Sequence, residues 1–175
     1  AYNNLTRTVD VNIGSTAVIL ADYGTLTILA LSGQNDSIFA SIEANGGGFV
    51  SIANGDVKNT FNGTTQLNIA GGARITNTFG TIRLTATGGN KSNGAYLDFS
   101  GSGFGSDTDV TTDVTSNNTA KVNIGMSGSV QAWIVGKDVV ISATMGALDV
   151  ESNCRGKSSG LYAESTVHAY VTSNI

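Results

Sequence analysis

Apolar and polar residues alternate with a period of two along most of the chain. Near its start, Val9, Val11 and Ile13 are separated by the polar Asp10 and Asn12. Successive side chains of a β-strand point to opposite faces, so this alternation predicts a strand with one buried face. No segment shows the i, i+3, i+4, i+7 spacing of an amphipathic helix over three turns. The chain is therefore expected to be an all-β protein built from short strands.

Turn-forming residues divide the alternating runs and set the expected strand lengths. In the first third of the chain, Gly, Asn and Asp predict turns or loops at residues 14–15, 22–24, 33–36, 45–48, 54–56 and 62–63. Short strands are expected between these turns. The later segment 106–118 is much more polar and includes Asp107, Asp109 and Asp113, which predicts a solvated, flexible loop.

Three landmarks show that the sequence repeats. Asn-Ile pairs start at Asn12, Asn68 and Asn123, and these starts are almost evenly spaced. A central Gly recurs at positions 24, 80 and 136, and a Gly followed by a large apolar residue recurs at positions 48, 103 and 160. A period of about 55 residues that independent landmarks share indicates a repeat architecture. The chain is interpreted as one solenoid domain, residues 1–175, with repeats at approximately 9–65, 66–120 and 121–173.

A constant period favours a parallel β-helix, or β-solenoid, over a β-sandwich, because each solenoid coil stacks on an equivalent coil. Apolar side chains are expected in interior columns, one of which contains Ile13, Ile69 and Ile124, while Thr, Ser and Asn line the outside. The coils are expected to be right-handed, as parallel crossovers generally are. With coils of about 18 residues, each repeat supplies about three coils, and about nine coils form a rod about 40–45 Å long.

The last two residues, Asn174 and Ile175, form another Asn-Ile pair after the pair at Asn123. They are expected to begin a fourth repeat. Exposed coil ends are strand edges that favour pairing. We therefore expect a segment of a longer array or a unit that stacks end to end, with neighbouring repeats or other copies as its partners.

Composition narrows the range of functions. The chain has 23 Gly, no Pro and 13% charged residues, with a net charge of −4. Its nine Lys and Arg residues are not clustered, which argues against nucleic acid and anionic membrane surfaces as partners. No apolar run approaches the ~20 residues of a membrane-spanning helix. Cys154 is the only cysteine, so neither an intrachain disulfide nor a thiolate metal cluster can form.

The repeats share several short sequence motifs. They are Val-Asn-Ile-Gly and Leu-Asn-Ile-Ala at residues 11–14 and 67–70, Tyr-Gly-Thr-Leu and Phe-Gly-Thr-Ile at 23–26 and 79–82, Gly-rich turns before Phe49, Phe104 and Leu161, and a final run ending at 172–175. Across nearly the whole chain they resemble the leukotoxin-like and haemagglutinin-like filamentous adhesins of bacteria. The resemblance implies a long parallel β-helical shaft at the cell surface or secreted, with no catalytic residues to carry over. Cys154 and the polar segment 106–118 differ from the usual composition of such adhesin repeats.

A polysaccharide-active or polysaccharide-binding protein is the alternative function. Glycoside hydrolysis needs two carboxyl groups about 5–9 Å apart, and sugar-stacking aromatic rings are expected beside them. Asp107, Asp109 and Asp113 form the only close acidic group in the sequence, and Phe104 is the nearest large aromatic residue. His168 is expected on the outward side of a strand without a nucleophile beside it, which argues against a catalytic triad. We therefore expect the protein not to be an enzyme.

Calcium is the one metal that the sequence suggests, although no cofactor is expected. Residues 103–107 resemble half of a calcium-binding nonapeptide repeat. Such sites need the pattern on consecutive turns, because one turn supplies only part of the oxygen shell. The equivalent turns at 48–49 and 160–161 lack the Asp. A loop shaped by the repeat is the preferred interpretation, and if calcium binds, Asp107 and Asp109 are its candidate ligands.

The remaining surface residues do not change this interpretation. Trp133, Tyr23 and Phe79 are interpreted as turn-packing residues rather than ligand platforms. Outward Thr rows could order water for ice binding, but Thr-x-Thr is not repeated at one place in each expected coil. The sequence therefore predicts a non-catalytic structural segment of an extracellular adhesin or filament, which mediates surface attachment or matrix formation and has host or matrix glycans as candidate ligands.

Overall fold

The computed structural model describes residues 1–33, 35–126 and 130–175 of the chain. Within these residues the backbone forms eleven β-strands and no helix. In chain order the strands are β1 (Tyr2–Ile13), β2 (Val18–Ala21), β3 (Thr25–Leu31), β4 (Asn35–Gly47), β5 (Val50–Ala70), β6 (Arg74–Gly88), β7 (Asn90–Ser102), β8 (Gly105–Met126), β9 (Trp133–Met145), β10 (Leu148–Ser159) and β11 (Tyr162–Asn174). The all-β class predicted from the alternating pattern is confirmed.

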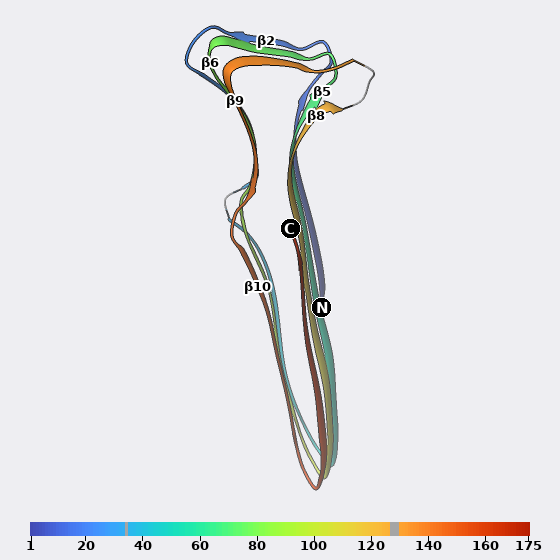
Figure 1. Cartoon of the computed structure of the whole chain (residues 1–175). Helices are drawn as coiled ribbons and strands as arrows, with labels where there is room; N and C mark the ends of the chain where they lie inside the picture. The colour runs from blue at the N-terminus through green and yellow to red at the C-terminus, as the bar shows by residue number, and fades with distance from the viewer. Residues whose placement is uncertain (34, 127–129) are drawn as a thin grey trace.

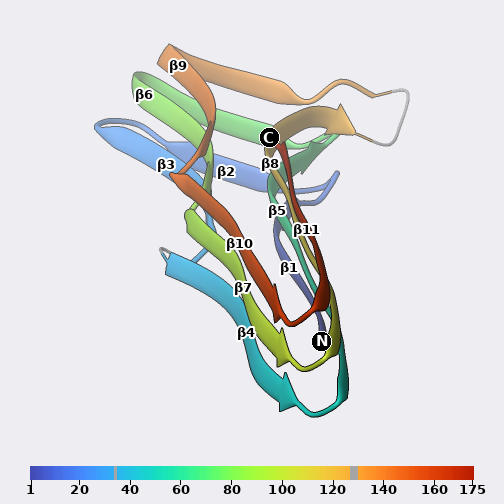
Figure 2. The ribbon, with the colours of Figure 1, turned by 90° about the horizontal axis from the view of Figure 1, so that it is seen from below.

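The strands form three parallel sheets in which successive coils lie on top of one another (Figure 2). One sheet has the strand order β1-β5-β8-β11, and the second has the order β10-β7-β4. In the third sheet, β6 is central, with β2 and β3 along one edge and β9 along the other. All of these pairings between described strands are parallel. The predicted parallel β-solenoid is therefore confirmed.

Each repeat forms one coil, which has a broad head above a long, narrow stem (Figure 1). β2 and the first part of β6 cross the head, β4, β7 and β10 follow one side of the stem, and β5, β8 and β11 follow the other. Val11 pairs with Leu67 and Leu67 with Val122, so one coil contains one whole sequence repeat. The predicted division of each repeat into several short coils is therefore wrong, and the stack has about three coils instead of about nine. The four strands of the β1-β5-β8-β11 sheet extend over only about 14 Å along the stacking axis.

The short-coil prediction fails because several expected turns lie inside long strands. Residues 54–56 and 62–63 belong to β5, which is 21 residues long. At Gly55, a Cβ atom would lie 2.6 Å from the ring of Phe99, and at Gly63 it would clash with the side-chain oxygen of Asn118. Gly55 allows the two sides of the stem to approach each other, whereas Gly63 leaves room for the Asn118 side chain of the neighbouring strand in the same sheet, and neither glycine reverses the chain.

The polar segment 106–118 is also a strand and not the predicted loop. It forms the first part of β8, and its Ser106, Thr108, Thr112 and Ser116 are buried between the two sides of the stem. The expectation of an apolar interior throughout is therefore wrong for the stem. The interior there is narrow, so small side chains interdigitate in a tight interface similar to a steric zipper.

Apolar residues fill the interior in two clusters that lie mainly in the middle coil. The head cluster contains Ala30, Leu67, Ile69, Ala73, Ile75, Ile82, Leu84 and Ala86. The stem cluster contains Ala40, Val57, Ala95, Leu97, Phe99, Val110 and Val114. The middle coil is covered on both sides by neighbouring coils, whereas the outer coils are covered on one side only. Burial of these apolar side chains is the main favourable term that holds the coils together.

The register confirms the predicted interior column. Ile13 pairs with Ile69, and Ile69 pairs with Ile124. Ile69 is fully buried, whereas Ile124, in the last of the three coils, is 40% exposed. The Asn-Ile pair at the end of the chain does not continue this column, because Asn174 pairs with Asn117. The expectation that Asn174 begins a fourth repeat is therefore wrong.

Candidate functional sites

The two predicted calcium ligands, Asp107 and Asp109, point outward from β8 and are exposed. In register, Asp107 lies between Ile52 of β5 and Glu164 of β11, whereas both neighbours of Asp109 are uncharged. The fold thus brings Glu164 beside Asp107, which the sequence did not predict because the two residues are far apart in the chain. Among the described residues, no group of three or more His, Cys, Asp or Glu side chains is arranged to hold a metal ion. Calcium at Asp107 and Asp109 stays a prediction.

A shallow, open groove of about 620 Å³ lies close to the tip of the stem, beside this acidic pair. Its lining includes Val50, Ile52 and Tyr162 as apolar or aromatic surfaces, together with Asp107 and Glu164. Both carboxylates are exposed. The groove therefore offers solvated hydrogen-bond acceptors and one aromatic ring to a ligand.

Aromatic side chains form a short ladder at the tip of the stem. Phe49 and Phe104 are stacked with ring centroids 5.2 Å apart, and Tyr162 meets Phe104 edge to face at 5.8 Å. Tyr23 and Phe79 form a second stack at the head, with centroids 5.2 Å apart. The stacked faces contact each other and are not free for a ligand. The geometry of Tyr23 and Phe79 therefore fits the packing role expected from the sequence.

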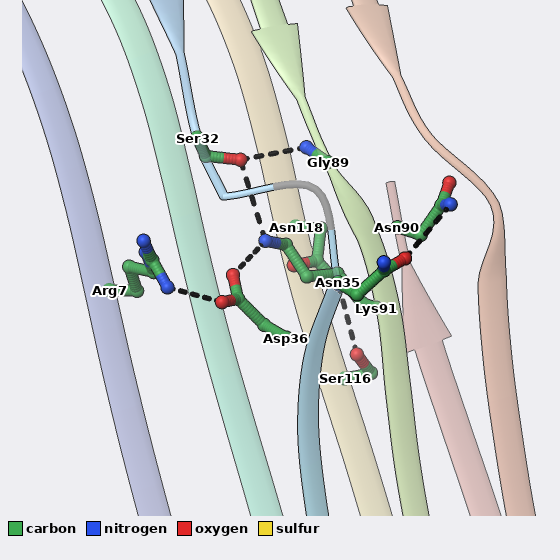
Figure 3. A network of polar contacts seen from close by, with 9 residues as sticks. All are labelled: Arg7, Ser32, Asn35, Asp36, Gly89, Asn90, Lys91, Ser116 and Asn118. Atoms are coloured by element: carbon green, nitrogen blue, oxygen red, sulfur yellow. Dashed lines mark hydrogen bonds and ion pairs between the residues drawn. The ribbon is translucent and has the colours of Figure 1, made fainter.

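A network of charged and polar side chains lies where the stem meets the head (Figure 3). Asp36 of β4 forms ion pairs with Lys91 of β7 and Arg7 of β1, so a single carboxylate binds two cations from different strands. Lys91 is only 4% exposed, and its Nζ atom lies 3.4 Å from the hydroxyl of Ser32 and 5.5 Å from the centre of the Phe61 ring. The sequence did not predict this network, because its members lie far apart in the chain.

The network at the junction is closed, which favours a structural role. Ser32 also accepts a hydrogen bond from the backbone N–H of Gly89 at 2.7 Å, so it connects adjacent coils. The small cavity beside Lys91, lined also by Arg7 and Asn118, has no room for a water-sized ligand. The charges of Asp36 and Lys91 therefore compensate each other inside the network, whereas the Arg7 side chain reaches solvent and is 44% exposed.

The two most reactive side-chain types in the chain are not arranged for nucleophilic catalysis. Cys154 in β10 is half-buried, and its thiol donates a hydrogen bond to the carbonyl of Val110 at 3.5 Å. Burial raises the pKa of the Cys154 thiol, which keeps it protonated. His168 lies on the exposed outer side of β11, as expected, and stacks on Tyr170 at 5.9 Å. Its register neighbour in β8 is Thr111.

Regular polar ladders cover the outer face of the β1-β5-β8-β11 sheet. In one column, the Asn68 amide donates to Asn12 at 2.9 Å and Asn123 donates to Asn68 at 2.7 Å. Three adjacent columns contain only Thr and Asn at every position, and we call them the Thr/Asn face. Its columns are Asn4-Thr60-Thr115-Thr172, Thr6-Asn62-Asn117-Asn174 and Thr8-Thr64-Thr119.

The sequence interpretation missed the Thr/Asn face because it depended on the wrong coil length. With the short coils expected from the sequence, Thr and Asn fall at different places around the axis. With the observed register, Thr60 pairs with Thr115 and Thr64 with Thr119, so Thr-x-Asn-x-Thr repeats at one place in two successive coils. The observed register thus gives rows that alternate Thr with Asn, a pattern that the argument from Thr-x-Thr in short coils did not consider.

Comparison of the chain with protein-family models, with curated protein sequences and with solved structures finds no match. Within the described residues, no helix is long and apolar enough to span a membrane. Any statement about function therefore depends on the geometry of the coils and their surfaces.

Proposed function

We propose that the chain is a non-catalytic structural segment of an extracellular bacterial adhesin or filament, in which it serves as a stiff shaft. The observation that carries this proposal is the continuous backbone pairing between coils. β5 and β8 pair from Val50 with Gly105 through Ile69 with Ile124, and the three stem strands on the other side, β4, β7 and β10, are also paired along their lengths. Side-chain amide ladders add further bonds between coils. A structure joined along such lengths resists bending, because each coil can move only with its neighbours.

The same ladders support neighbouring repeats or other copies as partners. A further repeat with the sequence of residues 8–65, continuing from β11 in the same register, would set Asp10 opposite Lys121 and Glu43 opposite Arg155; a separate copy fits there only without its first residues, because β11 already pairs with Asp113 to Asn117. These positions follow from the columns Asp10-Gln66-Lys121 and Glu43-Asp98-Arg155. Both contacts join opposite charges, which favours continuation of the stack in this register.

Protease resistance tests the structural role. The nine Lys and Arg residues offer cleavage sites to trypsin, but cleavage requires local opening of the backbone. We expect the chain to stay intact under conditions that digest the variant Leu97→Asp, which places a charge in the stem core. The matched control is Tyr96→Asp, because Tyr96 is adjacent and points outward. Digestion of the unmodified chain as fast as Leu97→Asp would contradict a stiff shaft.

Labelling of intact source cells with an antibody to the chain tests the extracellular location.

Polysaccharide binding is a second candidate function, and the groove near the stem tip is the observation that favours it. Tyr162 offers an aromatic ring, and Asp107 and Glu164 offer acceptors for sugar hydroxyl groups. If this function is correct, Tyr162→Ala should abolish retention on a glycan array, whereas Tyr23→Ala at the head should not. Depolymerisation of any polysaccharide by the purified chain would replace the non-catalytic proposal.

A further inference from the structure

The Thr/Asn face is uniform across the two coils that carry it completely. Its residues are Thr60, Asn62 and Thr64 in β5 and Thr115, Asn117 and Thr119 in β8. The flanking strand β1 has Thr or Asn in all three columns, and β11 has them in the two columns that it reaches. Uniform composition is not required for packing, because these side chains point away from the buried interior.

The geometry of the face forms a two-dimensional array. Outward side chains of one strand are about 6.6 Å apart, and neighbouring strands are about 4.8 Å apart. The array thus presents hydroxyl and amide groups at two regular spacings, as a ligand with a regular lattice requires. The β-branched Thr side chains have restricted rotamers, so their hydroxyl and methyl groups hold regular positions.

The central Asn column is fixed by its own hydrogen bonds. The amide of Asn117 donates to Asn62 at 2.9 Å, and the amide of Asn174 donates to Asn117 at 2.7 Å. Each bond uses one amide hydrogen of the donor, so the second hydrogen stays available to a ligand. Within the described part of the chain, the hydroxyls of Thr60, Thr64 and Thr119 form no side-chain hydrogen bond, and they are equally available.

The face carries no charge, and its borders are sharply defined. On one side, Lys58 and Asp113 neutralise each other through an ion pair of 2.8 Å. On the other side, the next outward column contains Asp10, Gln66 and Lys121. No described strand covers the face, which forms the outer side of the stem (Figure 1). An uncharged array of donors and acceptors complements an uncharged lattice, whereas an ionic ligand would find no counter-charge there.

We propose that the Thr/Asn face binds ice. The hydroxyl and amide groups hold a layer of water in two regular directions, the Thr methyl groups limit the positions that this water can take, and the ordered layer joins the ice surface. The rigidity of the coils supplies the order in advance, so little conformational entropy is lost on binding. This binding function is independent of the structural role proposed above.

Ice-affinity partitioning tests the proposal. The full chain, unlabelled because Lys58 and Lys121 border the face, is mixed with a non-binding protein of distinguishable size while an ice hemisphere grows slowly, and gel electrophoresis compares the two proteins in the ice and in the remaining liquid. The test variant is Thr64→Tyr/Thr115→Tyr, which places two bulky rings in the array. The matched control is Thr85→Tyr, because Thr85 is an outward, half-buried Thr of the middle coil on the head. Circular dichroism melting curves show whether each variant remains folded.

We expect the unmodified chain and Thr85→Tyr to enter the ice and to arrest the melting and growth of small crystals. Thr64→Tyr/Thr115→Tyr should be excluded from ice to the level of the non-binding protein while it keeps its melting temperature. Exclusion of the unmodified chain from ice would overturn the proposal. Equal incorporation of both variants would also overturn it, and so would retention of the chain on crystalline cellulose or chitin without affinity for ice.

Discussion

Asp36 is the residue on which the junction between stem and head depends. Its carboxylate is the partner of both Lys91 and Arg7, and Lys91 is almost completely buried. Transfer of a cation out of water is costly unless an opposite charge compensates it. Ser32 and the Phe61 ring also lie near the Lys91 ammonium group, but neither carries a negative charge.

The variant Asp36→Asn should therefore destabilise the protein while it preserves the shape of the side chain. We expect the free energy of unfolding to fall by about 3–5 kcal/mol, because Lys91 would stay buried without a counter-charge. The measurement is urea unfolding followed by circular dichroism. Asp113→Asn is the matched control, since Asp113 binds the exposed Lys58 at 2.8 Å, and it should leave the unfolding midpoint nearly unchanged. Equal effects of the two variants would show that the junction is solvated.

Cys154 gives a second prediction at the scale of a residue. Burial raises the pKa of its thiol, so the fraction of reactive thiolate at a given pH is lower than in an unfolded chain. Alkylation by iodoacetamide at pH 8 should be slower in the folded protein than in the urea-unfolded protein, and the folded rate should rise at a higher pH than the unfolded rate. An alkylation rate of the folded protein equal to that of the urea-unfolded protein would contradict the burial of Cys154.

The stem strands are long because glycine and small polar residues let two sheets lie close together. Gly101 of β7 shows the limit, since a Cβ atom there would lie 2.6 Å from the Ser106 hydroxyl oxygen and 3.2 Å from that of Ser51. We expect Gly101→Ala to lower the free energy of unfolding by about 1–3 kcal/mol through overpacking. Gly105→Ala is the control, because no atom lies within 4 Å of a Cβ at that position. Thermal unfolding curves provide the comparison.

The asparagine column through Asn68 is one of the side-chain ladders that join the coils outside the core. Asn68 both donates to Asn12 and accepts from Asn123. Asn68→Ala removes both bonds, and we expect a loss of about 1–2 kcal/mol in the free energy of unfolding. Gln66→Ala, two residues earlier on the same face, should cost much less. If both variants unfold at the same urea concentration, the side-chain ladder does not stabilise the stack.

The alternation within strands, the parallel stacking and the interior column at Ile69 could be predicted from the sequence, because they depend on the repeat period and on the order of apolar and polar residues. It was not sufficient for the length of a coil. Gly55 and Gly63 were interpreted as turn residues from their local preferences, but the approach of Phe99 to Gly55 across the stem and the pairing of Gly63 with Asn118 in the next coil override these preferences. The junction network and the Thr/Asn face depend on contacts between coils, so they could not be located until the coil length was known.

At the scale of the whole molecule, the central claim is that one repeat makes one coil. Asp10, Gln66 and Lys121 then lie in one outward column on three successive strands. Spin labels at positions 10 and 121 would be two strands apart, a backbone separation of about 10 Å. In a rod of short coils, the same positions would be about six coils apart, a separation of about 29 Å.

Electron paramagnetic resonance of the doubly labelled variant Asp10→Cys/Lys121→Cys, in a Cys154→Ser background, distinguishes the two arrangements most directly. We predict strong dipolar broadening of the continuous-wave spectrum relative to the two singly labelled variants. An unbroadened spectrum, together with the longer of these two separations in a pulsed dipolar measurement, would contradict the single-coil repeat.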